Sequence, residues 1–432
     1  MGTAEYWREF AGWAAGPVTL PAEASARASR AFLDTAACIL AGRGTQAAVS
    51  ACALDQRVPA NRAFAMAAAA HALEFDDYDR PTIGHPSTVL VPAILALGGS
   101  RELSGSEALT AYVLGLEAMD RMGEAVNPAH YERGWHATAT LGTLGAAVAA
   151  ARLLGLQHNA MLSAMAIAAS AAAGLKGQFG STGKFLHAGQ AARAGMDAVL
   201  MAAAGAEGRA KTVSEFARVF GPERPQSPGR FENPLAILQY GLVIKRWPAC
   251  GYLGRLIPAA LELAAETTPD QIASIEIEMP PRNAAVASVL VPGTPDEALF
   301  SAPYCVAVCL ATGSLTVADF TVDALERPEI VRLMERTTLR TAAHQFSTTD
   351  LVAEDPDRLR VTMSEGRVVE LLCTELPGSP EAPVSTEMLS AKLQDAAGPG
   401  DDVPELLTLL DGLADLPDIA PLTSRLELAH AA

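Results

Sequence analysis

Aromatic and basic residues are both scarce in this sequence. Phe, Trp and Tyr make up 5% of its 432 residues, although half of the chain is hydrophobic. The apolar residues are therefore mostly alanine, leucine and valine, whose size lets helices pack closely, so we expect a large helical core. The formal net charge is −17. Without a basic tract to displace counterions from phosphates, we expect no nucleic-acid partner.

The chain also lacks paired cysteines and long apolar runs. None of its six cysteines belongs to a Cys-x-x-Cys pair, so we expect buried free thiols in a reducing compartment rather than zinc or iron–sulfur ligands. The first ten residues have neither the basic nor the apolar region of a signal peptide. No run reaches the roughly 18 apolar residues of a membrane helix. We therefore expect a cytoplasmic protein without a membrane partner.

The first 250 residues have helical spacing almost throughout. Residues 22–42 form a clear amphipathic segment that ends at a glycine. Ser104 and Glu107 form a capping-box pattern at the start of another helix. Residues 91–97 predict a short helix, with Pro92 tolerated in its first turn.

The patterning changes after about residue 250. Residues 272–279 alternate isoleucine with polar residues, which predicts a strand. Residues 358–363 and 368–374 flank a hairpin turn, and helical patterning returns near residue 386. We predict a mainly α fold. Its domains are an all-helical domain of residues 1–250 and 386–432 and a smaller α+β lid domain of residues 251–385.

The stretch from residue 71 to 92 concentrates charged side chains between an alanine-rich run and an apolar run. Its charged and titratable members after the opening histidine are Glu74, Asp76, Asp77, Asp79, Arg80 and His85. A helix end followed by a Pro- and Gly-containing turn explains this composition as well as a functional site does. His85 and, further on, His136 each precede a predicted helix. A histidine there can be a general acid or base near neutral pH, or can simply bond nearby backbone.

Lys184 lies in a glycine-rich stretch that fails as a P-loop. Gln178 stands where that motif needs its first glycine, and Phe185 where it needs a hydroxyl. Two alternatives remain, a carboxylate-binding anion site or a tight helix–helix turn with an exposed lysine. Lys245 and Arg246 beside a Trp-Pro turn are either the second half of a substrate clamp or an ordinary basic hinge.

Five short motifs follow one another from residue 75 to 307: FDD…HP, GWHAT, GKxLHxGxAAxAG, KxWPxC and FSxPYxxA. In this order they resemble the MmgE/PrpD family, which includes 2-methylcitrate dehydratases, cis-aconitate decarboxylase and iminodisuccinate epimerase. The resemblance covers most of the chain. It implies a large all-helical domain that contains both chain ends, a smaller α/β lid, no required metal or organic cofactor, and a homodimer.

The resemblance also assigns roles to single residues. His85 and His136 look like the family's two active-site histidines, and Lys184 like its active-site lysine. Lys245 looks like the lysine before the lid, and Tyr304 like the lid tyrosine, although a buried structural tyrosine is the equal alternative from the sequence itself. We expect Glu74, Asp76 and Arg246 to join Lys245 in binding the substrate.

These assignments predict a cofactor-independent lyase of the dehydratase type that acts on a small anionic di- or tricarboxylate such as 2-methylcitrate. The alternatives are an epimerase or isomerase, a decarboxylase of a related polycarboxylate, or a non-catalytic paralogue that only binds carboxylates. Two residues depart from the pattern. Glu74 stands where the decarboxylase pattern has aspartate, and Tyr78 stands where threonine is frequent.

Overall fold

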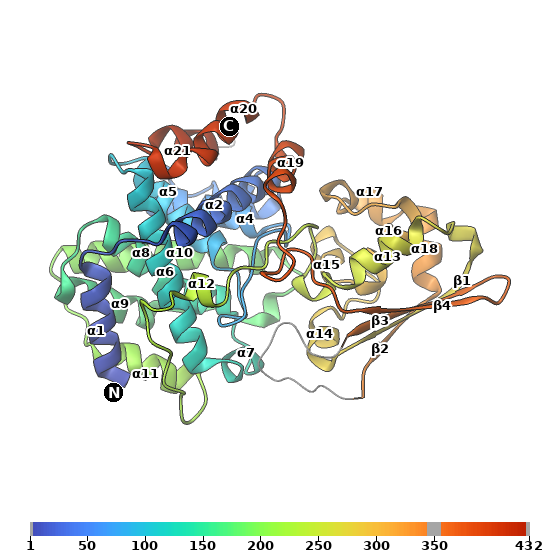
Figure 1. The fold of residues 1–432 in the computed structure, drawn as a ribbon, viewed down its shortest axis with the longest axis horizontal. Coiled ribbons are helices and arrows are strands. Elements are labelled where there is room, and N and C mark those ends of the chain that lie inside the picture. Colours follow the sequence, from blue (N-terminus) through green and yellow to red (C-terminus); the bar gives the residue numbers. More distant parts are fainter. Residues whose placement is uncertain (1–2, 344–355, 429–432) are drawn as a thin grey trace.

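The computed structural model describes residues 3–343 and 356–428. Within these ranges the chain is mainly α-helical, with one four-stranded sheet. Figure 1 shows an extended molecule in which a helical body adjoins a smaller part that carries the sheet. The predicted mainly α fold with a smaller α+β part is confirmed.

Many of the buried contacts between the helices of the helical body are made by alanine side chains. Helices α8 and α10 lie against each other, and α10 also packs on α4. The predicted capping box is present, because Ser104 and Glu107 each bond the other's backbone at the start of α6. The helices are α1 (Thr3–Ala15), α2 (Ala22–Gly42), α3 (Gln46–Ala51), α4 (Pro59–His71), α5 (Ser87–Gly98), α6 (Gly105–Val126), α7 (Ala129–Glu132), α8 (Ala137–Leu153), α9 (His158–Ala171), α10 (Thr182–Ala203), α11 (Lys211–Phe220) and α12 (Ala236–Gln239).

The prediction for the start of α5 was wrong. The helix begins at Ser87, four residues before the predicted start, so Pro92 lies inside it rather than in its first turn. All twelve residues of α5 are buried. Packing on every side therefore outweighs the loss of one backbone donor at the proline.

Three helices near the C-terminus return to the helical body: α19 (Thr386–Ala396), α20 (Val403–Asp411) and α21 (Ala420–Leu426). Helix α19 packs on α2, and α21 packs on α5. In Figure 1 these red helices lie above the blue N-terminal ones, far from the sheet in which the chain has just run.

The sheet has the order β2-β1-β3-β4. The predicted strand and hairpin are present, whereas β2 was not predicted. It pairs parallel to β1, and the other neighbours are antiparallel. Helices α13, α16 and α18 lie beside one face in Figure 1. The strands are β1 (Ile272–Met279), β2 (Thr337–Thr341), β3 (Asp357–Met363) and β4 (Val368–Cys373), and the helices are α13 (Leu256–Ala264), α14 (Pro281–Val286), α15 (Pro295–Ala298), α16 (Ala302–Thr312), α17 (Val322–Leu325) and α18 (Pro328–Glu335).

Two large hydrophobic cores follow this arrangement. One takes its side chains from the helical body, including α2, α6, α8 and α19. The other is built mostly from α13, α16 and the buried faces of β1 and β3. The predicted domain boundaries near residues 250 and 386 stay predictions.

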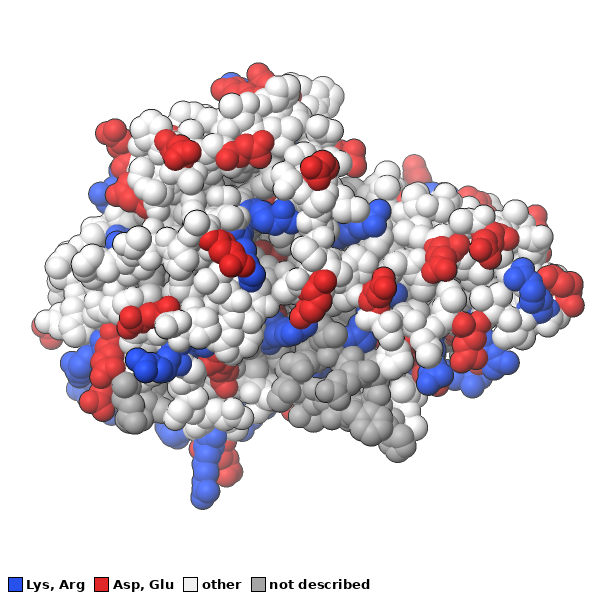
Figure 2. Space-filling view, viewed as in Figure 1, with Lys and Arg blue, Asp and Glu red and all other residues white. Residues whose placement is uncertain are grey.

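On the face drawn in Figure 2, the charged side chains of the described residues lie mostly singly or in small groups. Figure 2 shows acidic side chains on both parts of the visible face, with basic ones among them. In the described ranges, no helix combines the length and the apolar character that a bilayer crossing needs.

Candidate active site

Glu74 lies at the centre of the predicted site, on the loop that follows α4. Its backbone φ is +49°, a left-handed conformation that costs a non-glycine residue about 1–2 kcal/mol. The buried carboxylate accepts a hydrogen bond from the ammonium group of Lys184 and lies 3.5 Å from Nζ of Lys245. Nζ of Lys245 also donates to the carbonyl oxygen of Glu74 at 2.7 Å. Two lysines from distant parts of the sequence thus meet at one carboxylate.

Asp76, two residues further along the loop, lies close to two histidines. Nδ1 of His71 lies 2.7 Å and Nδ1 of His85 lies 3.3 Å from the same carboxylate oxygen. Burial works to raise the pKa of Asp76, but the facing His85 and His71 outweigh it and hold that pKa well below its usual range. On the other edge of its ring, Nε2 of His85 lies 3.9 Å from a carboxylate oxygen of Glu74. His85 therefore bridges the two acidic side chains.

His136 precedes α8 and is buried behind this pair. Its ring stacks on that of His71 with centroids 5.6 Å apart, and its Nδ1 lies 3.0 Å from Nδ1 of His187. Burial, together with His71 and His187, lowers the pKa of His136 well below its ordinary value. The imidazole is therefore neutral at pH 7, a state in which a ring nitrogen can accept a proton.

Hydrogen bonds fix the shape of the loop between these residues. Asp77 accepts a bond from the hydroxyl of Ser87 and a 3.3 Å bond from its backbone N–H, at the start of α5. Gly84 allows the loop to touch the first turn of α8, since a Cβ there would lie 2.9 Å from the backbone nitrogen of Thr138. The hydroxyl of Thr138 in turn accepts a 3.1 Å bond from the N–H of His85. This contact brings the His85 loop to the helix that follows His136.

The two lysines are held in a setting that favours added negative charge. Burial, followed by the nearby Lys245 ammonium, lowers the pKa of Lys184 well below its ordinary value. Burial also lowers the pKa of Lys245. An anion that approaches these two groups stabilises their charged forms. Carboxylate binding is therefore the interaction that the geometry favours.

A small cavity of about 40 Å³ lies among these groups. Glu74, His85, His136 and Lys184 all contribute to its wall. We call it the inner cavity. Its remaining lining residues are Tyr78, Ile83, Gly84, Tyr131, Phe179, Cys250, Gly251, Tyr252, Val286 and Phe300.

Two of the predicted site residues lie elsewhere. The hydroxyl of Tyr304 donates to the backbone carbonyl of Asp319, and the whole residue is buried in the core of the α+β part. Arg246 is exposed, and its guanidinium lies 5.1 Å from the ring centroid of Trp247. The structure thus brings together Glu74, Asp76, His85, His136, Lys184 and Lys245, but it adds neither Tyr304 nor Arg246 to them.

One group of described residues has the spacing of a metal site. The ligand atoms of His71, Asp76 and His85 lie within 4.8 Å of one another. The charge of Lys184 is close enough to His71 to lower the pKa of that imidazole, after the larger effect of burial. A divalent cation at this place would meet the same repulsion. The expectation that the site needs no metal stays a prediction.

Sequence reasoning gave no role to His71 or His187, although the histidine of the GKxLHxGxAAxAG motif is His187. His71 is the last residue of α4, three positions before Glu74. His187 follows Lys184 by three residues on α10, a spacing that places both on one helix face. Its helical spacing from Lys184 could have indicated His187. The contact between His71 and Asp76 could not be predicted, because it depends on the fold of the loop after α4.

Two family models match the chain. The MmgE/PrpD N-terminal domain matches residues 8–223, and the MmgE/PrpD C-terminal domain matches residues 247–403. The two models together account for most of the sequence, including every residue of the buried cluster except Lys245.

Three proteins similar to this chain have the same name. Cis-aconitate decarboxylase of Mus musculus is 27% identical over 389 residues, which cover 85% of this chain and 78% of the mouse protein. The Homo sapiens protein of that name is also 27% identical, with 85% and 79% covered. The Aspergillus terreus protein is 26% identical over 464 residues, with 96% and 94% covered.

Proposed function

Because the chain belongs to the MmgE/PrpD family, we propose that it is a carboxy-lyase that removes CO2 from a small di- or tricarboxylate, with cis-aconitate as the first substrate to test. The sequence alone favoured a dehydratase acting on a compound such as 2-methylcitrate. The relatives are named for the decarboxylase reaction, so their names support what was the alternative prediction.

The observation that carries the proposal is the meeting of His85, His136 and Lys184 at one buried cavity. When a C–CO2 bond breaks, its electron pair stays on carbon and must be stabilised until a proton arrives. Lys184 and Lys245 supply positive charge for the substrate carboxylates and for this developing charge. His85 supplies the proton, the neutral ring of His136 can accept one, and the walls of the cavity exclude water.

The carboxylate of Glu74 occupies the position beside Lys184 that a substrate carboxylate needs. It accepts the hydrogen bond of Lys184 and lies 3.9 Å from Nε2 of His85. A bound substrate must therefore compete with Glu74 for Lys184, or share the two lysines with it. The pairing of Glu74 with Lys184 and Lys245 balances their charge, so the group that displaces it must itself be an anion.

A second candidate is a dehydratase or epimerase of the same family, acting on a different polycarboxylate. It is favoured by the two departures from the decarboxylase pattern, because both Glu74 and Tyr78 line the inner cavity. The Tyr78 hydroxyl donates to the carbonyl of Gly251 at 3.4 Å, which places its ring in the wall beside His85. A homodimer and a cytoplasmic location remain expectations from the resemblance and the composition.

The test is a panel of cis-aconitate, 2-methylcitrate, citrate and iminodisuccinate, each followed by NMR in deuterated water. A carboxy-lyase releases CO2 and leaves one solvent deuterium on the product carbon. Loss of water from 2-methylcitrate, without CO2, supports the dehydratase. Solvent deuterium that enters a substrate with loss of neither supports the epimerase. If none of the four compounds changes, the catalytic proposal fails.

A further inference from the structure

A second, larger cavity lies directly outside the inner one. Its volume is about 610 Å³, and four residues line both cavities: Tyr131, Phe179, Val286 and Phe300. We call it the outer cavity. By comparison, the inner cavity of about 40 Å³ has room for only a few water molecules. A tricarboxylate therefore cannot fit in the inner cavity as it stands, and the outer one is the adjoining space with room for it.

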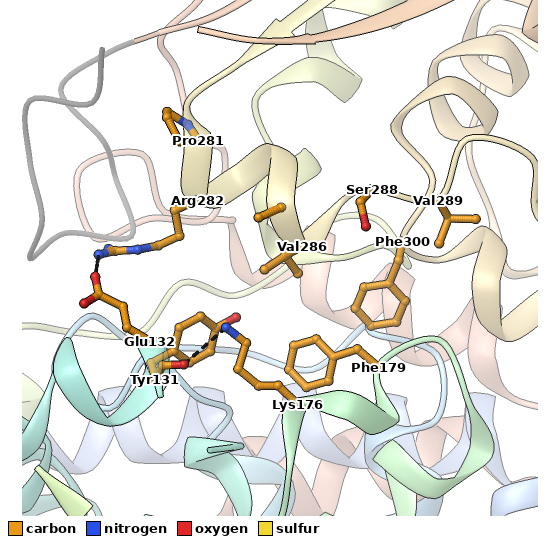
Figure 3. A pocket seen from close by; sticks show the side chains of 11 residues that line it. Tyr131, Glu132, Lys176, Phe179, Pro281, Arg282, Val286, Ser288, Val289 and Phe300 are labelled. Atoms are coloured by element: carbon orange, nitrogen blue, oxygen red, sulfur yellow. Dashed lines mark hydrogen bonds and ion pairs between the residues drawn. The ribbon is translucent and has the colours of Figure 1, made fainter. Parts of the chain in front are cut away.

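Two basic side chains from opposite sides line the outer cavity (Figure 3). Nζ of Lys176, from the helical body, donates to the carbonyl oxygen of Tyr131 at 3.2 Å and lies 3.6 Å from the centroid of its ring. Arg282, on α14 of the α+β part, pairs with Glu132 at 2.9 Å. The Arg282 side chain is 9% exposed and that of Glu132 54% exposed, so the carboxylate faces solvent more than the guanidinium does.

Within the described ranges, the charged side chains that line the outer cavity are two cations, Lys176 and Arg282, and one anion, Glu132. Among the described residues, no carboxylate lies at ion-pair distance from Nζ of Lys176. Burial and then the charge of Arg282 lower the pKa of Lys176 to about 8. An anion placed between the two cations relieves that repulsion.

A pair of phenyl rings separates the outer cations from the inner lysine. Phe179 comes from the helical body and Phe300 from the segment before α16, and their rings are stacked with centroids 5.7 Å apart. Nζ of Lys184 lies 5.1 Å from one centroid and 5.2 Å from the other. Figure 3 shows both rings facing each other at one end of the outer cavity, with Lys176 and Arg282 further out.

We propose that the outer cavity is a second carboxylate-binding site, in which Lys176 and Arg282 hold a di- or tricarboxylate before it passes the Phe179–Phe300 pair. The class of ligand rests on the proposed function. The site itself rests on the cavity, its two cations and its continuity with the inner cavity. Lys176 and Arg282 bind the ligand and take no part in the chemical step.

Kinetics of single variants test this role. Lys176→Gln and Arg282→Gln should each raise KM about threefold to tenfold, the effect of losing one charged hydrogen bond at a partly exposed site, while kcat changes less than twofold. Glu132→Gln should lower KM, because it removes the carboxylate that competes for Arg282. Arg340→Gln is the matched control, since it removes an arginine that pairs with Glu276 at 3.4 Å on the sheet, outside both cavities.

The proposal is overturned if KM stays unchanged in both Lys176→Gln and Arg282→Gln, or if these variants lose kcat alone. It is also overturned if Arg340→Gln raises KM as much as they do. A result in which Glu132→Gln raises KM in step with Arg282→Gln points to a structural ion pair and equally contradicts the binding role.

Citrate binding separates this proposal from the proposed reaction, because it needs no turnover. Calorimetric titration of the Lys184→Gln/Lys245→Gln double variant should reveal a weak, salt-sensitive citrate site that disappears when Lys176→Gln and Arg282→Gln are added. If the double variant does not fold, Lys176→Gln and Arg282→Gln are introduced into the wild type instead. Together they must weaken citrate binding at least about threefold, the smallest effect expected on KM. A citrate affinity that does not change when Lys176 and Arg282 are replaced contradicts the proposed outer site. A protein that binds citrate there but converts none of the four compounds fails only the catalytic proposal.

Discussion

The ammonium group of Lys392, on α19, donates a 2.7 Å hydrogen bond to the backbone carbonyl of Phe75. It also donates to the carbonyl of Lys245 at 3.1 Å and pairs with Asp34 at 2.6 Å. Phe75 directly follows Glu74, and Lys245 is the second lysine at that carboxylate. One buried side chain from the helices near the C-terminus thus ties together the two backbone segments that form the candidate site.

Replacing Lys392 should destabilise the protein strongly. Lys392→Met leaves the buried carboxylate of Asp34 and two backbone carbonyls without their donor, which should lower the free energy of unfolding by about 3 kcal/mol. Urea unfolding measures the loss. The double variant Lys392→Met/Asp34→Asn removes the unpaired charge and should recover part of the stability. A loss below about 1 kcal/mol, a value typical of an exposed ion pair, would contradict the bracing role.

The histidine variants should lose rate rather than affinity. His85→Gln or His136→Gln should lower kcat by roughly 10²- to 10⁴-fold, the usual range for one general acid–base group, while substrate binding changes little. Steady-state kinetics at saturating substrate measure this. Near-normal kcat in both variants would rule out the acid–base assignment and make the carboxylates of Glu74 and Asp76 the next residues to examine.

Lys184 and Lys245 should behave differently, because we propose that they bind the substrate carboxylates in the ground state. Lys184→Ala and Lys245→Ala should raise KM strongly, and kcat should fall as well where extra negative charge develops near them. Salt screens their attraction as well as the repulsion from the net charge of −17. Since the lysines lie closest to the substrate, KM of the wild type should rise with ionic strength. A KM that falls with salt would show that the overall charge dominates.

Activity should survive the removal of metal ions. His71, Asp76 and His85 have ligand-like spacing, but we predict that His71 hydrogen-bonds to Asp76 and that His85 transfers protons. Exhaustive chelation followed by an assay in metal-free buffer tests this. Full activity is expected. Activity that is lost and returns only with a divalent ion would assign the three residues to a metal centre.

His130 provides a pH test that requires no substrate. Its Nε2 lies 2.7 Å from the hydroxyl oxygen of Thr140, and burial lowers the pKa of His130 from 6.5 to about 4. Protonating His130 therefore costs more in the folded state than in the unfolded state. The contribution of the neutral imidazole to the free energy of unfolding is complete above pH 6.5, and it is lost as the pH falls towards 4.

Between pH 7 and pH 5 the wild type should lose about 2 kcal/mol of unfolding free energy relative to His130→Gln. The measurement is urea unfolding of both proteins at the two pH values. Comparing the two proteins cancels the titration of the buried carboxyl groups, among them Asp77, whose pKa burial raises to about 8. An equal change in both proteins would show that His130 is not protonated on unfolding.

Local patterns in the sequence predicted the elements whose partners are local. The capping box at Ser104 and the alternation in residues 272–279 each reflect contacts within a few residues, and both are present. Strand β2 was missed because the strand with which it pairs among the described residues, β1, is far away in the sequence. Pro92 was predicted to lie in a first turn because the sequence of this segment does not reveal that other helices bury α5 on all sides.

The site residues likewise differ in whether their contacts could be predicted from the sequence. The motifs that contain His85, His136 and Lys184 predicted residues that do meet at one cavity. Tyr304 belongs to an equally recognisable motif, yet its hydroxyl bonds the carbonyl of Asp319. A motif indicates that a residue type is required at a position, but the partner of its side chain depends on how distant segments pack.

Release of CO2 from carboxyl-labelled cis-aconitate tests the central claim most directly, measured side by side for the wild type and for the His85→Gln and His136→Gln variants. We predict that the wild type releases one CO2 per substrate consumed. At least one of the two variants should do so at least about 100-fold more slowly at saturating substrate. A wild type that releases no CO2, or two variants that release it as fast as the wild type, would contradict the claim that this buried cluster is a decarboxylase site.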